Sequence, residues 1–331
     1  MVVVREGGDA AQGSGDNVTP RFRPVDHAGL LPGRGWAAPR AAAVGLAVVV
    51  LVRSMAPLSL AQTQSVRIQV IDVGQADGIL VRTPNGHWVL IDAGQGTLLA
   101  DSLGPHFGVT RLALAVGSHR HRDHIGGMDN VLNRIATDLY VGDTSEYASG
   151  ADDDRLRDTL RTRGIAVRLP AADTVEIDKV RFIVLPPDPT DDANENDNSV
   201  MVRLEFGEFS MLYTGDAEEA ERDWLVAHHP DLLDADVLKA SHHGSHNGAS
   251  DAWLAAVMPE RVVISAGLHM GFRHPHAEAV NAYEQAVGGD DRVYCTNRHG
   301  TVTIYGYADG RIRIRRQRVT NKSCAFDGTL Y

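Results

Sequence analysis

Ten residues, Ser118 to Gly127, carry three histidines, one aspartate and two arginines and end in two glycines, SHRHRDHIGG. The motif inside them is HxHxDH, and it follows the apolar run LALAV. Neutral imidazoles beside a carboxylate are donors that zinc and related divalent cations prefer. His119 and His121, two residues apart, would point together at one cation, whereas Asp123 and His124 would reach a second. The spacing predicts a metal site rather than a solvated polar loop.

Other apolar runs also end in polar side chains that can bind metals. The run LIDAG ends near Asp92, LYTGD delivers Asp216, and LKASHHGS delivers His242 and His243. An aspartate among several histidines can supply an anionic oxygen that bridges two cations. The pattern therefore predicts a binuclear centre at the ends of strands.

The elements that must position these residues alternate as in an α/β protein. Short apolar runs bounded by turn residues predict strands: SVRIQVIDVG, GILVRTP, HWVLIDAG, LALAVGS, VRFIVLPP, SVMVRLEFG, FSMLYTGD, ADVLKAS, RVVISAG, RVYCTN, TVTIYG and RIRIRR. Helical periodicity predicts helices at about 127–136, 152–163, 217–227, 249–257 and 276–287. The order favours two sheets between helical layers over one doubly wound sheet. Arginines alternate through residues 311–318, which we expect at a sheet edge.

The charge of the chain limits its binding partners. Its 331 residues include 32 basic and 43 acidic ones, so the formal net charge is −11. Such a charge repels polyanions unless a local basic patch or a bound metal reverses the field. This counts against a protein that binds nucleic acid through a generally basic surface.

Residues 1–61 read as a leader that precedes a hydrolase domain over residues 62–331. Arg34 and Arg40 flank an apolar stretch of twelve residues, 41–52, and the small residues of SLA end at Ala61. These are the parts of a secretory signal peptide, and twelve residues are too few for a bilayer that needs about 20. We expect cleavage near Ala61, export to the periplasm or the cell exterior, and no stable membrane association afterwards. An uncleaved membrane anchor is the alternative.

The chain has two cysteines, Cys295 and Cys324, both near the C-terminus. In an oxidising compartment such a pair can form a disulfide that holds the tail, and two unrelated free thiols are the equal alternative. With no CxxC spacing, the cysteines do not predict a zinc knuckle.

Several motifs together resemble a known family. They are IDVGQADGILVRTPNGHWVLIDAG, SHRHRDHIGGMDNVL, NDNSVMVRLEFGEFSMLYTGDAEEA, DVLKASHHGSHNGAS and FRHPHAEAV. They resemble the metallo-β-lactamase fold and, within it, the soluble hydrolase-like domain of the competence protein ComEC and its free-standing relatives. The resemblance runs from Val66 to Val302 and implies an α/β, four-layer αββα sandwich. The matched motifs include no multi-span channel, so we expect the hydrolase domain to stand alone behind its export signal.

The resemblance also implies a set of metal ligands for two divalent ions. They are His119, His121, Asp123, His124, Asp216 and His242, with Asp216 bridging the two ions. Zinc is the expected metal, and manganese and iron are the alternatives. The strand-end histidine that the fold usually carries between HxHxDH and GD is absent, and NDNS, residues 196–199, stands in its place. One ion would then have fewer protein ligands.

The expected catalytic residues are Asp123, His243 and His274. Asp123 would orient the attacking hydroxide, and the two histidines would protonate the leaving group or hold an anionic substrate. Residues expected to support the site or touch the substrate are Asp92, Asn196, Asn198, Ser199, Lys239, Ser245 and His276. For Lys239, the alternative to a functional role is a strand residue whose charge lies in solvent, and neither is favoured. Arg120 and Arg122 are expected at the surface.

Three function hypotheses follow. The resemblance favours phosphodiester hydrolysis, with nucleic acid, a nucleotide or a phosphorylated surface polymer as the substrate. The second hypothesis is hydrolysis of a lactone, thioester or lactam, against which the missing central histidine and the KxxHHGS stretch argue. The third is a non-catalytic binding protein, which the nearly complete ligand set disfavours. No protein partner is expected.

Overall fold

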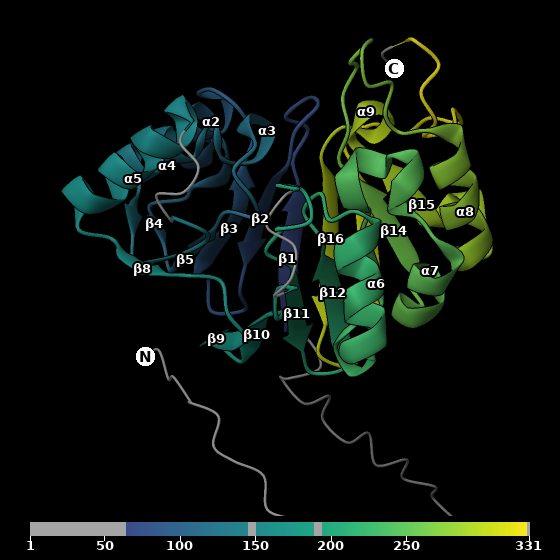
Figure 1. Cartoon of the computed structure of the whole chain (residues 1–331), viewed down its shortest axis with the longest axis horizontal. Coiled ribbons are helices and arrows are strands. Elements are labelled where there is room, and N and C mark those ends of the chain that lie inside the picture. The colour runs from purple at the N-terminus through teal and green to yellow at the C-terminus, as the bar shows by residue number, and fades with distance from the viewer. Residues whose placement is uncertain (1–63, 145–149, 189–193, 330–331) are drawn as a thin grey trace, which may run out of the picture. The chain divides into compact units, whose positions relative to one another are not determined.

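Two β-sheets face each other at the centre of the structure (Figure 1). The structure is a computed structural model and describes residues 64–144, 150–188 and 194–329. The predicted leader, residues 1–61, therefore lies outside the described residues. Within the described ranges, no helix has the length and apolar character needed to cross a membrane.

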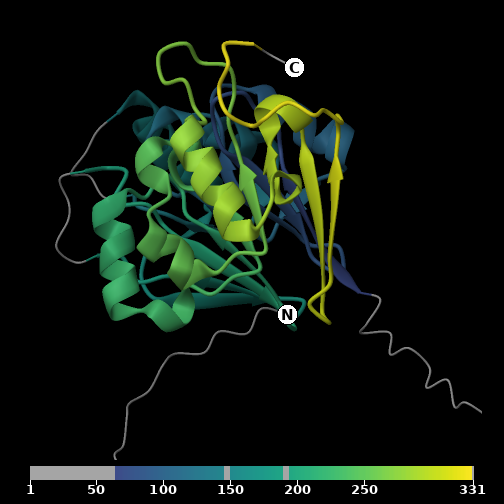
Figure 2. The ribbon, with the colours of Figure 1, turned by 90° about the vertical axis from the view of Figure 1, so that its right-hand side faces the viewer.

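The first sheet has eight strands in the order β17-β16-β1-β2-β3-β5-β7-β8. They are β1 (Ser65–Val70), β2 (Gly78–Arg82), β3 (Trp88–Ala93), β5 (Leu114–Val116), β7 (Leu139–Val141), β8 (Ala166–Arg168), β16 (Val302–Tyr307) and β17 (Ile312–Arg316). The hairpin of β16 and β17, yellow in Figure 2, lies beside the first strand, β1. The arginine-rich strand β17 is at the edge of this sheet, which confirms the prediction for residues 311–318.

The second sheet has seven strands in the order β15-β14-β13-β12-β11-β10-β9. They are β9 (Asp173–Ile177), β10 (Val180–Val184), β11 (Val202–Phe206), β12 (Phe209–Tyr213), β13 (Val237–Lys239), β14 (Arg261–Ile264) and β15 (Val293–Cys295). A separate pair consists of β4 (Arg111–Leu112) and β6 (Ala136–Thr137).

Helices cover the outer faces of both sheets. The first sheet is covered by α2 (Leu98–Phe107), α4 (Met128–Arg134) and α5 (Ala151–Arg163), and the second by α6 (Glu219–His228), α7 (Asp251–Val257) and α8 (Ala277–Val287). Short helices are α3 (Arg122–Ile125), α9 (Thr296–His299), η1 (Pro230–Leu232), η2 (Ser241–Gly244), η3 (His246–Gly248) and η4 (Asp290–Arg292). The predicted αββα four-layer sandwich is confirmed.

Alternation along the strands creates these layers. In β1 and β11 every second side chain is buried, and these side chains form one core cluster between the sheets. Successive side chains of a strand point to opposite faces, so the other face is free to meet helices or solvent. On the outer faces, α2, α4 and α5 bury one apolar cluster and α6, α7 and α8 another.

Helix α2 is an element that the sequence did not predict. Its residues include Gly104 and Pro105, which are typical of breaks in a helix. Pro105 lies near the end of the helix, and the chain leaves it at Gly108 with a left-handed φ of 73°. Burial of Leu99 and Leu103 against the sheet outweighs the local preference of the Gly-Pro pair.

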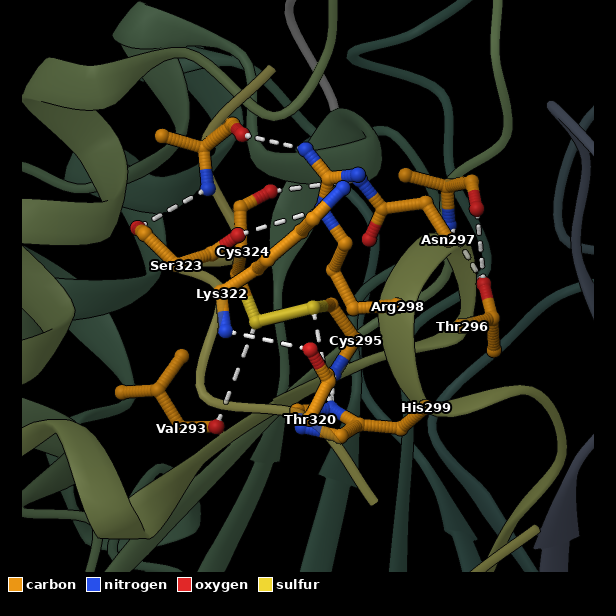
Figure 3. Close-up of a disulfide and its surroundings, with 12 residues drawn as sticks. Val293, Cys295, Thr296, Asn297, Arg298, His299, Thr320, Lys322, Ser323 and Cys324 are labelled. Atoms are coloured by element: carbon orange, nitrogen blue, oxygen red, sulfur yellow. Dashed lines mark hydrogen bonds between the residues drawn. A yellow bond between two sulfur atoms is a disulfide. The ribbon is translucent and has the colours of Figure 1, made fainter. Parts of the chain in front are cut away.

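A disulfide joins Cys295, at the end of β15, to Cys324 in the C-terminal tail (Figure 3). The structure thus selects the disulfide over two free thiols. Farther along the tail, the backbone N–H of Phe326 donates to the carbonyl of Pro275 at 2.8 Å. The tail therefore contacts the loop that carries His274.

Candidate metal centre

The candidate site lies where five strands end. Strand β3 pairs in parallel with β5, and β12, β13 and β14 form a parallel series in the other sheet. The carboxyl ends of parallel strands meet at one edge of a sheet, and ligand sites commonly form there. Asp92 lies in β3 and the predicted metal ligands follow β5, β12 and β13, so tertiary pairing brings distant motifs together.

Four donors form the centre of the site. One ligand atom each from Asp123, His124, Asp216 and His243 lies within 4.8 Å of all the others. Asp216 Oδ1 is 3.2 Å from His124 Nε2, and Asp216 Oδ2 is 3.5 Å from His243 Nε2. His243 Nε2 is also 3.3 Å from Asp123 Oδ2. Asp216 is thus the central carboxylate, as expected for a bridging ligand.

His119 and His121 form a second donor pair beside this group. Nε2 of His119 and Nδ1 of His121 are 3.0 Å apart, and the ring centroid of His119 is 4.1 Å from that of His124. His119 is buried, whereas His121 is exposed at the cavity. The HxHxDH motif therefore places His119 and His121 side by side, next to the donor group that contains Asp123 and His124.

The structure places His243, rather than the predicted ligand His242, in the central donor group. His243 lies in the central donor group, whereas Nε2 of His242 is 3.8 Å from Asp216 and its Nδ1 is 3.2 Å from Glu218. Both residues have a left-handed φ, 46° and 54°, within the tight turn η2. Two adjacent histidines on such a turn cannot be ranked from the sequence, because the turn decides where each ring lies.

The donor set fits divalent cations. Among the described residues, His124 Nε2, His243 Nε2, Asp216 Oδ1 and Asn196 Oδ1 are buried and have no hydrogen-bond partner. Unpartnered buried polar atoms are costly and rare, and here three of them belong to one group of donors. Asn196, in the NDNS stretch, lines the cavity above these donors.

The charge distribution of the site also favours bound cations. Burial alone would lower the pKa of His124, but the carboxylates of Asp216 and Asp92 raise it well above its usual value. The site therefore concentrates negative charge around a buried imidazole. Cations bound by these donors would neutralise that charge.

Asp92 orients one donor. Its Oδ2 is 2.8 Å from His124 Nδ1, and its two oxygens accept hydrogen bonds from the N–H and the hydroxyl of Ser118 at 2.8 and 2.7 Å. A carboxylate bonded to one ring nitrogen leaves the other nitrogen to face a metal. The geometry matches the supporting role predicted for Asp92.

Ser199 connects two predicted ligands. Its hydroxyl accepts a hydrogen bond from the N–H of Asp216 at 3.0 Å and lies 3.5 Å from Nδ1 of His119. Gly215 makes this contact feasible, because a Cβ there would lie 2.8 Å from the Ser199 hydroxyl and its φ is 52°. Asn198, by contrast, donates from its side chain to the carbonyl of Asn194 at 3.2 Å.

The structure places Lys239 away from both solvent and the cavity. It is fully buried, forms an ion pair with Asp77 and donates to the carbonyl of Gly215 at 3.1 Å. The alternative prediction, that the charge of Lys239 lies in solvent, is therefore wrong. Lys239 instead supports the backbone beside Asp216. Sequence reasoning missed Asp77, although an aspartate in GQADG, at a predicted strand start, was a usable signal. Asp77 Oδ1 is 3.5 Å from His243 Nδ1.

A cavity of about 440 Å³ opens above the donors. It is lined by Gln75, His121, Arg122, Asp123, Asn196, Asp216, His242, His243, Phe272 and His274. All three predicted catalytic residues line it, and so does Arg122, which is exposed as predicted. Arg120 pairs instead with Asp143 and Glu195.

Like Asp92, Asn198, Ser199 and Lys239, the predicted supporting residues Ser245 and His276 do not line the cavity. The backbone N–H of Ser245 donates to the carbonyl of His242 at 2.8 Å. Nδ1 of His276 accepts a hydrogen bond from the N–H of His246 at 2.9 Å. Both residues hold the loops that carry the site histidines.

His274 lines the cavity as a neutral ring. Burial, with the neighbouring His243 and His242, lowers the pKa of His274 to about 3. A neutral ring at this position can hydrogen-bond a substrate, which is one of the two roles predicted for His274. Its Nδ1 is 3.4 Å from the side-chain nitrogen of Gln75, a cavity residue that sequence reasoning also missed.

Comparison with known proteins agrees with this geometry. The family model described as the metallo-beta-lactamase superfamily matches residues 71–296. ComE operon protein 3 of Bacillus subtilis (strain 168) is 28% identical over 256 residues, covering 71% of this chain and 32% of that protein. Competence protein ComA of Neisseria gonorrhoeae is 31% identical over 255 residues, covering 76% and 34%. The chain spans about a third of the length of these relatives.

Solved structures include the metallo-beta-lactamase fold protein YhfI from Bacillus subtilis, with a TM-score of 0.47 and 14% identity. That match covers 70% of this chain and 96% of YhfI. The family model and the competence proteins, rather than this distant likeness, decide the classification. The chain belongs to the metallo-β-lactamase superfamily of metal-dependent hydrolases and resembles its ComEC-like members.

Proposed function

We propose that this hydrolase is an exported phosphodiesterase that cleaves nucleic acid or a nucleotide. The observation that carries the hydrolytic part is the group of Asp123, His124, Asp216 and His243, which leaves unpartnered donor atoms beneath an open cavity. The phosphodiester part rests on the residues around that cavity and on the relatives.

Two features support an anionic phosphodiester substrate. Arg122 lines the cavity beside the donors, and a guanidinium matches the geometry of phosphate oxygens. A further relative is named Recombination protein 2, of Haemophilus influenzae, and is 27% identical over 231 residues. Recombination is a reaction of DNA, so phosphodiester chemistry fits both the name of this relative and the cavity. The matched part is 27% of that relative's length.

The residues present have distinct expected roles. Asp123, His124, Asp216 and His243 would hold one cation, and His119 and His121 would hold a second together with Asp216. When bound, such a pair lowers the pKa of water and stabilises negative charge on phosphoryl oxygens. Burial would raise the pKa of Asp123, but the nearby imidazoles of His243 and His124 hold it below its usual range. An ionised Asp123 can accept a hydrogen bond from the attacking water.

The test uses bis-p-nitrophenyl phosphate and, in parallel, linear DNA. The protein is stripped of metal with a chelator and reloaded with zinc or manganese. We expect metal-dependent hydrolysis that His121→Ala abolishes and His228→Ala, at an exposed histidine of α6, retains.

Two bound ions per chain without hydrolysis of either substrate would reject the phosphodiesterase assignment. Turnover of a lactone or thioester in the same preparation would instead assign the alternative reaction. Export is tested separately by N-terminal sequencing of protein recovered outside the cytoplasm, which should begin at Gln62.

A further inference from the structure

We infer that Phe272 is a stacking platform for a nucleobase of the substrate and determines specificity for nucleoside-bearing phosphodiesters. The inference rests on the proposed phosphodiesterase function and adds a residue to it. Phe272 lines the same cavity as the metal donors, yet 55% of it is exposed. An exposed aromatic ring at the mouth of a site for phosphodiesters is suited to stack against a base.

A series of roughly parallel rings connects Phe272 with the donors. The ring centroids of Phe272 and His274 are 5.9 Å apart with an interplanar angle of 25°, and those of His274 and His243 are 6.4 Å apart at 28°. Phe272 thus lies two ring spacings from a metal donor. A nucleotide joins a flat base to a phosphate over a short sugar, so base and phosphate can occupy the two positions together.

The loop that carries Phe272, residues 267–274, is held in place at several points. The N–H of Gly267 donates to the side-chain oxygen of Gln75 at 3.1 Å. A Cβ on Gly267 would lie 2.3 Å from the backbone nitrogen of Gln75, so a larger residue would push the loop away. Near the tip, the N–H of Phe272 donates to Nδ1 of His269 at 3.2 Å. A platform ordered before binding loses little entropy when the base arrives.

The neighbours of Phe272 favour a nucleotide over a lipid surface. Arg122 lines the cavity with Phe272, and Arg273 is the next residue in the loop. Leu268 and Met270 are also exposed in the loop, but they do not line the cavity. Apolar contact with a membrane would use all three apolar side chains, whereas base stacking within the cavity would use Phe272 alone.

The experiment compares two esters with the same leaving group, thymidine 5′-p-nitrophenyl phosphate and methyl p-nitrophenyl phosphate. In both, water adds to phosphorus and the bond to the p-nitrophenolate oxygen breaks, so only the nucleoside differs. We expect Phe272→Ala to lower the ratio of kcat/KM for the thymidine ester to that for the methyl ester by about 5- to 100-fold. Phe272→Tyr should keep the ratio, as should Leu268→Ala in the same loop.

An unchanged ratio in Phe272→Ala would overturn the inference, as would equal losses in Phe272→Ala and Leu268→Ala. Calorimetric binding of thymidine 5′-monophosphate against methyl phosphate makes the same comparison without turnover. If neither ester is hydrolysed, the proposed function fails, and the ratio of these two affinities still decides the role of Phe272.

Discussion

Two buried clusters of potential metal donors differ in whether their polar atoms have hydrogen-bond partners. One is the metal centre of Asp123, His124, Asp216 and His243. The other is the tail anchor, which we define as Cys295, Arg298, His299 and Cys324. Both contain at least three histidine, cysteine or acidic groups within 4.8 Å of one another. Only the metal centre leaves several of these donor atoms without hydrogen bonds among the described residues.

The tail anchor is satisfied by the protein itself (Figure 3). Its two sulfurs are bonded to each other, so neither is a thiolate that could bind metal. Nδ1 of His299 accepts a hydrogen bond from the N–H of Cys295 at 3.0 Å. The buried guanidinium of Arg298 donates to the carbonyls of Ser323 and Thr329 at 3.2 and 2.8 Å. Donor residues alone therefore do not define a metal site, whereas converging unpartnered donor atoms do.

The largest effect should come from the metal centre. We expect His243→Ala to lower the bound metal from two ions per chain and to reduce kcat/KM by more than about 10²-fold, since loss of even a residue that orients a ligand costs 10- to 100-fold. His242→Ala should retain both ions. Metal analysis of the purified variants beside hydrolysis of bis-p-nitrophenyl phosphate makes the comparison. Loss of metal in His242→Ala but not in His243→Ala would reverse the ligand assignment.

The charged pair beneath the metal centre should matter next. Lys239→Met leaves the carboxylate of Asp77 buried without its cation, which we expect to lower the free energy of unfolding by about 3–5 kcal/mol. Urea unfolding of the metal-free protein measures this. The double variant with Asp77→Asn should recover part of the loss, because it removes the unpaired charge. If Lys239→Met is as stable as the parent protein, the ion pair of Lys239 with Asp77 is not required for stability.

Removing the disulfide tests whether the tail anchor stabilises the fold without contributing to metal binding. Replacing both Cys295 and Cys324 by serine opens a loop that spans 29 positions of sequence and should cost about 2–4 kcal/mol of stability. Under conditions where the variant remains folded, it should still bind two ions per chain. A loss of bound metal in the folded variant would contradict the division between the two clusters.

The smallest expected effect is a pH dependence at His299. Burial and the charge of Arg316 lower its pKa to about 4 in the folded protein, below the value of about 6.5 in an unfolded chain. The unfolded state therefore binds more protons between these values, so stability is full above about pH 6.5 and falls as the pH drops toward 4. Metal-free protein should lose about 1 kcal/mol more between pH 7 and pH 5 than His299→Gln does. Identical pH slopes in urea unfolding would contradict this.

Local patterns were enough to predict much of the architecture. Apolar runs ending in polar residues predicted where Asp92, His119 and Asp216 lie, because such runs form strands whose ends share an edge. Alternating arginines predicted the edge strand β17. Helix α2 was missed because its Gly-Pro pair is a local signal for a break, while the burial that stabilises it is a tertiary effect.

The sequence by itself determined the fold class, the HxHxDH and GD donors and the short strands that deliver them. The donors and strands depend on residue type and spacing over a few positions, whereas the fold class came from the order of the elements and from what the family resemblance implies. Only the tertiary structure decided which of His242 and His243 joins the donor group, that Asp77 neutralises Lys239, and that the two cysteines are bonded. Each of these depends on distances between segments remote in the chain, or on the direction of a strained turn, and neither is encoded in local spacing.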